Sequence, residues 1–302
     1  MSEIVLNKPL NGVDHDYGES GLHGYAWRFA MKFGAMNSPS SDILAELKLL
    51  SAMGFDYVEL TVEKPRTSPQ TLRQIKDQIT ESVRSLNISL LGHVPWRFEL
   101  GHPYRQSIFP YHRSIGVAQV HAKQIEEAIE TCHQLGIRKI TVHPPMLTRE
   151  TRRSEGRMVL REFEEAANMF VSTARDLGCT VLIENLDEEA FTMNDFDELF
   201  NEVPGMGFTL DIGHANIGKL ENSSFEYLRR FRDRLGHVHL SDNLGGYGDL
   251  HLPLGAGIID FARILREIRD LGYDETITLE IFSQDRTYLQ LSRERLVRAL
   301  GA

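Results

Sequence analysis

The sequence predicts a single (β/α)8 barrel, on three observations. The chain has 302 residues, which is too long for one ordinary sandwich or bundle but suits one large α/β barrel. Helical and β-rich segments alternate along the chain, which indicates a parallel sheet with crossover helices. No glycine-rich phosphate-binding motif follows any of the strands. The alternative architecture, a doubly wound open sheet, therefore lacks its usual signature.

We expect eight strands and eight helices in alternation. The strands are expected at residues 22–27, 56–60, 89–94, 139–143, 180–185, 207–212, 236–241 and 276–282. The helices are expected at 41–53, 69–86, 115–135, 158–177, 193–202, 223–234, 258–271 and 286–300. We find no linker or low-complexity run, so residues 1–302 are expected to form one barrel domain with residues 1–20 as a polar N-terminal extension.

A repeated junction marks the passage from helix to strand. An apolar residue followed by glycine ends five of the expected helices, and a β-rich run follows within a few residues. The pairs are Met53-Gly54, Leu135-Gly136, Leu177-Gly178, Leu235-Gly236 and Leu271-Gly272. Glycine just past a helix end supplies the left-handed backbone conformation that terminates the helix.

Composition narrows the class of partner. The formal net charge is −10, which disfavours a sequence-independent nucleic-acid binder and suits a small-molecule ligand. No apolar run approaches the roughly 20 residues of a membrane helix, and residues 1–24 are too polar for a signal peptide. Cys132 and Cys179 fit the pattern of small core residues. We therefore expect a cytoplasmic protein with no membrane partner.

Polar side chains stand at the C-terminal ends of the expected strands. In each strand one set of alternate residues is apolar and suits the helix layer, whereas the other set ends in His, Asp or Glu. These end residues are Glu59, His93, His143, Glu184, Asp211, His239 and Glu280. A buried carboxylate without a partner costs several kcal/mol. Polar residues at the same position of so many strands indicate a functional site rather than an apolar core.

Four of these residues have the character of a metal site. Glu184, Asp211, His239 and Glu280 come from four consecutive strands, whose C-terminal ends meet at the active-site face of a barrel. Converging carboxylates repel one another unless a cation lies among them. Three carboxylates and one imidazole suit one divalent ion, Mn²⁺, Mg²⁺, Co²⁺ or Zn²⁺. His237 lies one layer deeper, and we expect it in a core or supporting role.

At these residues the chain resembles the sugar phosphate isomerase/epimerase superfamily, a group with a xylose isomerase-like barrel that it shares with endonuclease IV. The matching stretches are VLIEN (181–185), GFTLDIGHANI (207–217), GHVHLSDN (236–243), DLHLPLGAGIIDF (249–261) and ITLEIF (277–282). The resemblance is to members such as D-tagatose 3-epimerase, hydroxypyruvate isomerase and inosose dehydratase. It implies one divalent metal held by Glu184, Asp211, His239 and Glu280.

The resemblance also implies a reaction. The metal binds a ketose and stabilises an enediolate, while Glu184 and Glu280 act as acid and base on a sugar or sugar phosphate. Epimerisation, aldose–ketose isomerisation and dehydration all remain open. Further substrate contacts are expected from Glu59, His93, Trp96, His143, His214, Asp249 and His251. Trp96 lies in the long segment 94–114, which has the length of a functional loop. We also expect a homo-oligomer.

Two other functions stay open. The endonuclease IV branch uses the same barrel with three zinc ions, and its further ligands would fall on His93, His143, His214, Asp249 and His251. We rank this apurinic-site endonuclease second, because Leu250 stands where that pattern has an arginine. The third possibility is a sugar-binding barrel that kept the metal site without turnover.

Overall fold

Eight parallel strands close into a barrel in the order β1 to β8, which confirms the expected fold. The structure is a computed structural model, and it describes residues 31–95, 117–147, 149–154, 156–187 and 190–301. The strands are β1 (Lys32–Met36), β2 (Tyr57–Thr61), β3 (Ser89–Val94), β4 (Lys139–Val142), β5 (Thr180–Glu184), β6 (Gly207–Asp211), β7 (Leu235–Leu240) and β8 (Thr276–Leu279).

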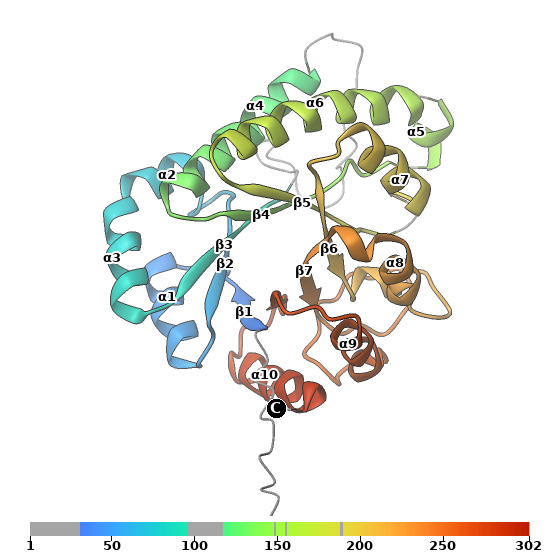
Figure 1. Ribbon diagram of the computed structural model, residues 1–302. Coiled ribbons are helices and arrows are strands. Elements are labelled where there is room, and N and C mark those ends of the chain that lie inside the picture. The colour runs from blue at the N-terminus through green and yellow to red at the C-terminus, as the bar shows by residue number, and fades with distance from the viewer. Residues whose placement is uncertain (1–30, 96–116, 148, 155, 188–189, 302) are drawn as a thin grey trace, which may run out of the picture.

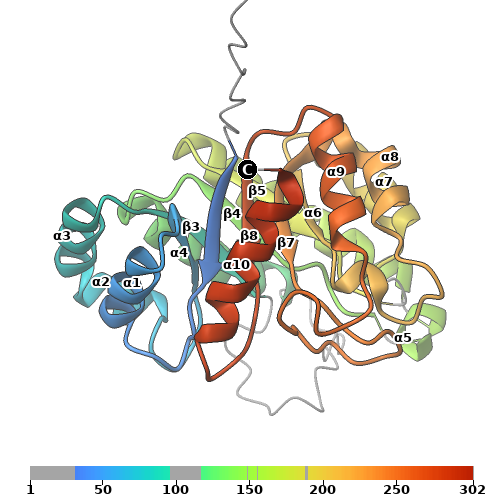
Figure 2. The ribbon, with the colours of Figure 1, turned by 90° about the horizontal axis from the view of Figure 1, so that it is seen from below.

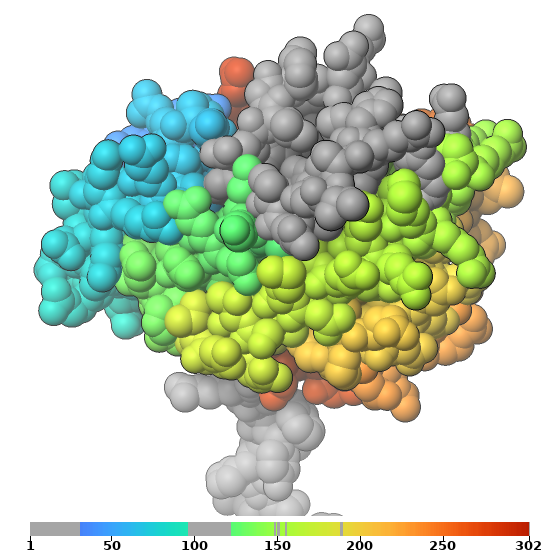
Figure 3. Space-filling model, turned by 90° about the horizontal axis from the view of Figure 1, so that it is seen from above, coloured from blue at the N-terminus to red at the C-terminus, as the bar shows by residue number. Residues whose placement is uncertain are grey.

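The helices form an outer ring around the strands (Figure 1). They are α1 (Ile43–Ala52), α2 (Pro69–Gln74), α3 (Lys76–Leu86), α4 (Val117–Gln134), α5 (Arg149–Ser154), α6 (Gly156–Asp176), α7 (Met193–Glu202), α8 (Ser224–Phe231), α9 (Phe261–Asp270) and α10 (Thr287–Leu300). Figure 2 shows the barrel from the side, with α10 crossing in front of the strands. The helices α4 and α6 pack side by side and make up much of the face in Figure 3.

The apolar core lies between the strands and the helices. Outward-facing strand residues such as Val58, Ile183 and Leu210 are fully buried there. Phe196 of α7 contacts the ring of Phe208 in β6 at 5.6 Å between centroids and belongs to a cluster of aromatic rings. This packing follows from the alternation of side chains along each strand, and it leaves the other set of residues to fill the barrel interior.

The barrel interior is unusually polar for this fold, in which branched apolar residues commonly fill the centre. The Tyr57 hydroxyl lies 3.0 Å from Thr278 Oγ1, and the hydroxyls of Thr141 and Thr209 are 2.9 Å apart. Gly34 leaves space for the Tyr57 ring, since a Cβ at this position would lie 2.1 Å from it. The inward residues therefore form hydrogen-bonded layers beneath the C-terminal face.

The first strand was wrongly predicted. The barrel's first strand is Lys32–Met36, which pairs with β2 and β8 and so closes the sheet. The expected strand at 22–27 lies outside the described residues. The prediction missed β1 because its sequence, KFGAM, is short and has a glycine at its centre, and glycine is depleted in strands. The proposed polar extension at 1–20 also lies outside the described residues.

Two helical predictions need correction. The expected helix 69–86 is two helices, α2 and α3, which meet at Ile75 with φ −110° and ψ 14°. The short helix α5 was missed because its sequence, RETRRS, has no apolar stripe to reveal it.

The glycine junctions are confirmed at four of the five positions. Gly54, Gly136, Gly178 and Gly272 all have φ between 68° and 82°, as helix-terminating glycines require. Gly236 instead lies within β7, where a Cβ would approach Leu182 Cδ2 to 2.9 Å. Close packing in the barrel, not helix termination, calls for glycine there.

None of the helices in the described part of the chain combines the length and the apolar character that crossing a bilayer requires.

Candidate metal and substrate site

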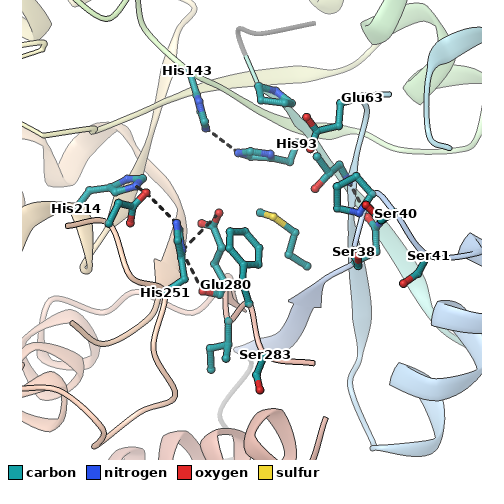
Figure 4. A pocket seen from close by; sticks show the side chains of 18 of the residues that line it. Ser38, Ser40, Ser41, Glu63, His93, His143, His214, His251, Glu280 and Ser283 are labelled. Atoms are coloured by element: carbon teal, nitrogen blue, oxygen red, sulfur yellow. Dashed lines mark hydrogen bonds and ion pairs between the residues drawn. The ribbon is translucent and has the colours of Figure 1, made fainter. Parts of the chain in front are cut away.

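A cavity of about 990 Å³ opens at the C-terminal ends of the strands. Segments that follow β1, β2, β3, β4, β5, β6, β7 and β8 all contribute to its wall. Figure 4 shows His93 facing His143 on one side, and His214, His251 and Glu280 gathered on another. Of the polar residues expected at the strand ends, His93, His143 and Glu280 therefore line one space.

The four predicted metal ligands converge at the base of this cavity. Glu184 and Asp211 are the last residues of β5 and β6, His239 lies near the end of β7, and Glu280 follows β8. Each offers one ligand atom, and these atoms all lie within 4.8 Å of one another. The Nδ1 atom of His239 is 3.0 Å from Glu184 Oε1 and 3.1 Å from Glu280 Oε2. We call these four residues the acidic cluster.

Two carboxylate oxygens in the acidic cluster are buried without a hydrogen-bond partner among the described residues. They are Asp211 Oδ2 and Glu280 Oε2, of which the second lies close to His239 Nδ1 but outside hydrogen-bonding geometry. Burial, together with the nearby charges of Glu184 and Glu280, raises the pKa of the Asp211 carboxyl to about 7 in the protein without a bound cation. Unused oxygens on crowded acids are the ligands that a divalent cation takes up.

The Asp211 carboxylate is held in a defined orientation. Asn185 bridges β5 and β6, because its Oδ1 accepts from the backbone N–H of Asp211 and its Nδ2 donates to the carbonyl of the same residue, both at 2.8 Å. The backbone N–H of His214 donates to Asp211 Oδ1 at 2.6 Å. One oxygen is thus engaged by the backbone, and Oδ2 remains for the acidic cluster.

Glu59 is placed differently from our expectation. Like Glu184, Asp211 and His239, it is fully buried and is not among the described residues that line the cavity. Its Oε1 is 2.9 Å from His239 Nε2, and its Oε2 is 2.8 Å from His237 Nε2 and also bonded by Thr278 Oγ1. Both oxygens are therefore occupied by protein groups. The geometry indicates a residue that positions His239 rather than a substrate contact, and it gives His237 the supporting role that we expected.

A second group of ligand atoms lies beside the acidic cluster. The Nε2 atoms of His93 and His143 are 2.9 Å apart and lie 3.3 Å and 3.1 Å from Glu184 Oε2. Burial alone would raise the pKa of the Glu184 carboxyl, but the neighbouring His239 and His143 lower it well below its ordinary value. Glu184 is consequently an ionised carboxylate. Its Oε1 faces His239, and its Oε2 faces His93 and His143.

A third group comprises His214, Asp249 and His251. Asp249 Oδ2 lies 3.2 Å from His214 Nε2 and 2.9 Å from His251 Nε2. Burial by itself would lower the pKa of His251, but Glu280 and Asp249 raise it to about 9. The backbone of His251 is left-handed, with φ 44°, which is uncommon outside glycine and is characteristic of functional sites.

Asp242 holds the loop that carries Asp249 and His251. Its carboxylate accepts hydrogen bonds from the backbone N–H groups of Gly255, Gly257 and Ile259 at 2.8–3.1 Å. Gly257 must lack a side chain, since a Cβ would lie 2.3 Å from Asp242 Oδ1. The sequence analysis missed this fully buried acid, because its partners are backbone groups that a motif search does not reveal.

Five of the other predicted substrate contacts line the cavity. They are His93, His143, His214, Asp249 and His251. Trp96 lies outside the described residues. Asn37 and Thr61 also line the cavity and were not predicted. Asn37 was missed because the first strand was expected ten residues too early in the chain, at 22–27.

Comparison with known proteins identifies relatives of the whole barrel. Residues 47–299 match the Xylose isomerase-like TIM barrel family. The uncharacterized protein MJ1311 of Methanocaldococcus jannaschii is 25% identical over 264 residues, which cover 84% of this chain and 85% of that protein. An inosose isomerase of Bacillus velezensis is 20% identical over 283 residues, which cover 86% of this chain and 89% of the enzyme.

A solved structure shows the same fold. The crystal structure of a D-tagatose 3-epimerase-like protein superposes with a TM-score of 0.71 and 23% sequence identity. The match covers 89% of this chain and 97% of that one.

Proposed function

Because the chain belongs to the Xylose isomerase-like TIM barrel family, we propose that it is a divalent-metal-dependent isomerase or epimerase of a sugar. The observation that carries this proposal is the acidic cluster, in which three carboxylates and one imidazole converge beneath a cavity of sugar-accommodating size. Relatives named as an inosose isomerase and as a 3-dehydro-D-guloside 4-epimerase support the reaction class.

The residues present fit a divalent cation. The buried oxygens Asp211 Oδ2 and Glu280 Oε2 have no hydrogen-bond partner among the described residues, and such oxygens are costly unless a cation compensates them. Glu184, Asp211, His239 and Glu280 would hold the ion, and the set suits Mn²⁺, Mg²⁺, Co²⁺ or Zn²⁺. When bound, the cation would polarise the ketose carbonyl and stabilise the negative charge that develops on its oxygen.

We propose that Glu184 and Glu280 act as an acid/base pair. Glu184 ends β5 and Glu280 follows β8, so they approach from either side of the two intervening strands. One carboxylate removes the proton from the carbon beside the carbonyl. For epimerisation the other returns a proton to the opposite face, whereas for a 1,2-isomerisation one carboxylate carries the proton between neighbouring carbons.

Histidines border the space that a sugar would occupy. His143, His214 and His251 line the cavity around the glutamates. Asp249 engages the Nε2 atoms of His214 and His251, and backbone carbonyls engage their Nδ1 atoms. We propose that these two rings, held in fixed positions, pack against the substrate. Asp249 fixes the direction in which both rings face, because its Oδ2 contacts an Nε2 atom of each.

The decisive experiment is solvent exchange. The metal-loaded protein is incubated in D₂O with a panel of ketopentoses and ketohexoses, and NMR follows deuterium at the carbon beside the carbonyl. We expect incorporation with at least one ketose and none with the Glu184→Gln variant. A wild-type protein that keeps its metal but exchanges with no ketose would contradict the proposed function.

A second candidate function is a trinuclear metal-dependent hydrolase of phosphodiesters, of the apurinic-site endonuclease type. The observation that favours it is the presence of two further ligand groups beside the acidic cluster. They are His93, His143 and Glu184 on one side, and His214, Asp249 and His251 on the other. Three ions in this arrangement would activate water for cleavage of a phosphodiester.

Metal stoichiometry separates the two candidates. Elemental analysis of the purified protein is expected to give one divalent ion per chain for the isomerase and three for the hydrolase. A parallel assay on duplex DNA that contains one abasic site supplies the functional readout. Nicking without proton exchange would reverse our ranking, and His93, His143, His214, Asp249 and His251 would then be metal ligands instead of substrate contacts.

A further inference from the structure

Two buried polar groups on the β1–β2 side of the cavity have no partner among the described residues. They are the side-chain amide nitrogen of Asn37, which follows β1, and the hydroxyl of Thr61, which ends β2. Both residues line the cavity, and they are 0% and 2% exposed. Unpartnered buried donors are rare in folded proteins and call for an explanation.

The position of Asn37 has an internal counterpart in Asn185. Asn185 follows β5 and uses both of its amide atoms on Asp211, the last residue of β6. Asn37 follows β1 and makes the first of these two bonds, since its Oδ1 accepts from the backbone N–H of Thr61 at 2.8 Å. The second donor is used in Asn185 and left over in Asn37. The same arrangement therefore leaves the amide N–H of Asn37, a residue of the cavity wall, without a partner among the described residues.

Thr61 is the uppermost of three inward residues of β2. Tyr57 and Glu59, below it, bond Thr278, His237 and His239 within the barrel. The Thr61 hydroxyl bonds none of the described groups, although its backbone N–H is fixed by Asn37. The hydrogen bond from the backbone N–H of Thr61 to Asn37 Oδ1 thus joins two residues of the cavity wall. One has an amide N–H and the other a hydroxyl without a partner among the described residues.

The charges around this wall favour an uncharged ligand. Arg286 donates to the buried Glu46 carboxylate, and Lys64 has an interaction partner of its own. The N-terminus of α1 is capped by Asp42, whose carboxylate accepts from the backbone N–H of Ala45. Glu63 adds a further carboxylate to the lining. A phosphate group on the sugar would therefore meet the carboxylate of Glu63, while Arg286 and Lys64 are already engaged by other groups.

The acidic cluster lies at the ends of β5 to β8, whereas Asn37 and Thr61 lie at the ends of β1 and β2. We infer that these two residues form a subsite that binds a hydroxyl group of an uncharged ketose other than the hydroxyls at its reacting carbons. The inference rests on the proposed function, because the acidic cluster sets which end of the sugar reacts. A sugar hydroxyl can accept from the amide of Asn37 while it exchanges a hydrogen bond with Thr61. The subsite would select sugars by a hydroxyl that takes no part in the reaction.

The test compares sugars that differ by one hydroxyl. A ketohexose that undergoes exchange is paired with its 4-, 5- and 6-deoxy analogues, and kcat/KM of exchange and Kd are measured for each. We expect the wild type to prefer the parent sugar over one of these analogues by at least roughly tenfold. Thr61→Val keeps the shape of the residue and should reduce this preference to near one. Asn37→Asp keeps the acceptor for Thr61 and should act likewise.

A matched control is Thr209→Val, which removes a buried hydroxyl from the barrel interior that bonds Thr141 instead of facing the cavity. It should lower the Tm and leave the preference between sugars unchanged. Thr61→Val should not lower the Tm, since its hydroxyl has no partner among the described residues.

The outcomes separate the subsite from the proposed function. An equal preference in wild type and Thr61→Val, with exchange intact, would overturn the subsite and leave the isomerase. Binding without exchange would contradict the isomerase, while the ratio of Kd values would still decide the subsite. Neither binding nor exchange with any ketose would overturn both. A tenfold preference for the 6-phosphate of the ketohexose would overturn the inference that the ligand is uncharged.

Discussion

His239 Nε2 lies 2.9 Å from Glu59 Oε1, and both side chains are fully buried. A carboxylate beside one imidazole nitrogen keeps the proton there, so the other nitrogen presents a lone pair. In this protein that other nitrogen is Nδ1, which faces Glu184 and Glu280 and would present its lone pair to a cation bound among them. The pair would thereby determine which atom of His239 is available to a metal.

Replacing Glu59 with glutamine tests this role. Glu59→Gln keeps the shape but loses the carboxylate that fixes the tautomer of His239. We expect the affinity for the divalent metal to fall about 10–100-fold, measured by competition with a chelator. Circular dichroism should show the fold retained. Unchanged metal affinity would mean that Glu59 only fills the barrel.

The proposed acid/base pair is tested by Glu184→Gln and Glu280→Gln. Each should reduce turnover by at least about 10²–10⁴-fold, because an amide cannot carry the proton. Metal content is measured beside the rate, since the amide is also a poorer ligand. The control is Glu275→Gln, which removes a half-exposed carboxylate bonded to Lys139 just before β8, at the opposite end of the barrel. A variant of Glu184 or Glu280 with full metal and full activity would exclude that residue from the reaction.

The protonation of Asp211 predicts how pH affects the metal-free protein. Burial raises the pKa of this carboxyl to about 7, whereas in the unfolded chain it is about 3.9. Between these values the folded state holds a proton that the unfolded state has lost, so stability falls as pH rises. Relative to Asp211→Asn, the free energy of unfolding should drop by up to about 1.4 kcal/mol per pH unit between about pH 4 and 7.

This difference is measured by urea unfolding of both proteins after chelation. Saturating divalent metal should restore the stability of the wild type near pH 7, because the cation compensates the ionised carboxylate. A pH-independent difference between wild type and Asp211→Asn would show that Asp211 is ionised throughout.

Gly34→Ala tests the packing of the barrel interior. The added Cβ would lie 2.1 Å from the ring of Tyr57, whose hydroxyl contacts Thr278. Overpacking of this kind costs about 1–3 kcal/mol, which thermal unfolding would detect as a lower Tm. Tyr57→Leu in the same background should recover part of the loss. If Gly34→Ala had no effect alone, the ring of Tyr57 would not be confined as described.

The sequence by itself determined the barrel and the four residues of the acidic cluster. Both depend on local periodicity, since alternation along a strand tells which side chains face inward and a strand's end tells where the chemistry lies. Glu184 and Asp211 could therefore be assigned from the few residues around each of them. The resemblance to a known superfamily rested on the same short stretches.

Tertiary structure decided the role of each remaining residue. Glu59 and His239 are 180 residues apart in the chain, and only closure of the barrel reveals that this glutamate supports a histidine instead of facing the cavity. Asn37 and Thr61 likewise became a candidate subsite only once β1 was found at Lys32–Met36 and paired with β2. Hydrogen bonds between distant strands leave no periodic trace in a sequence, because each partner is locally an ordinary polar residue.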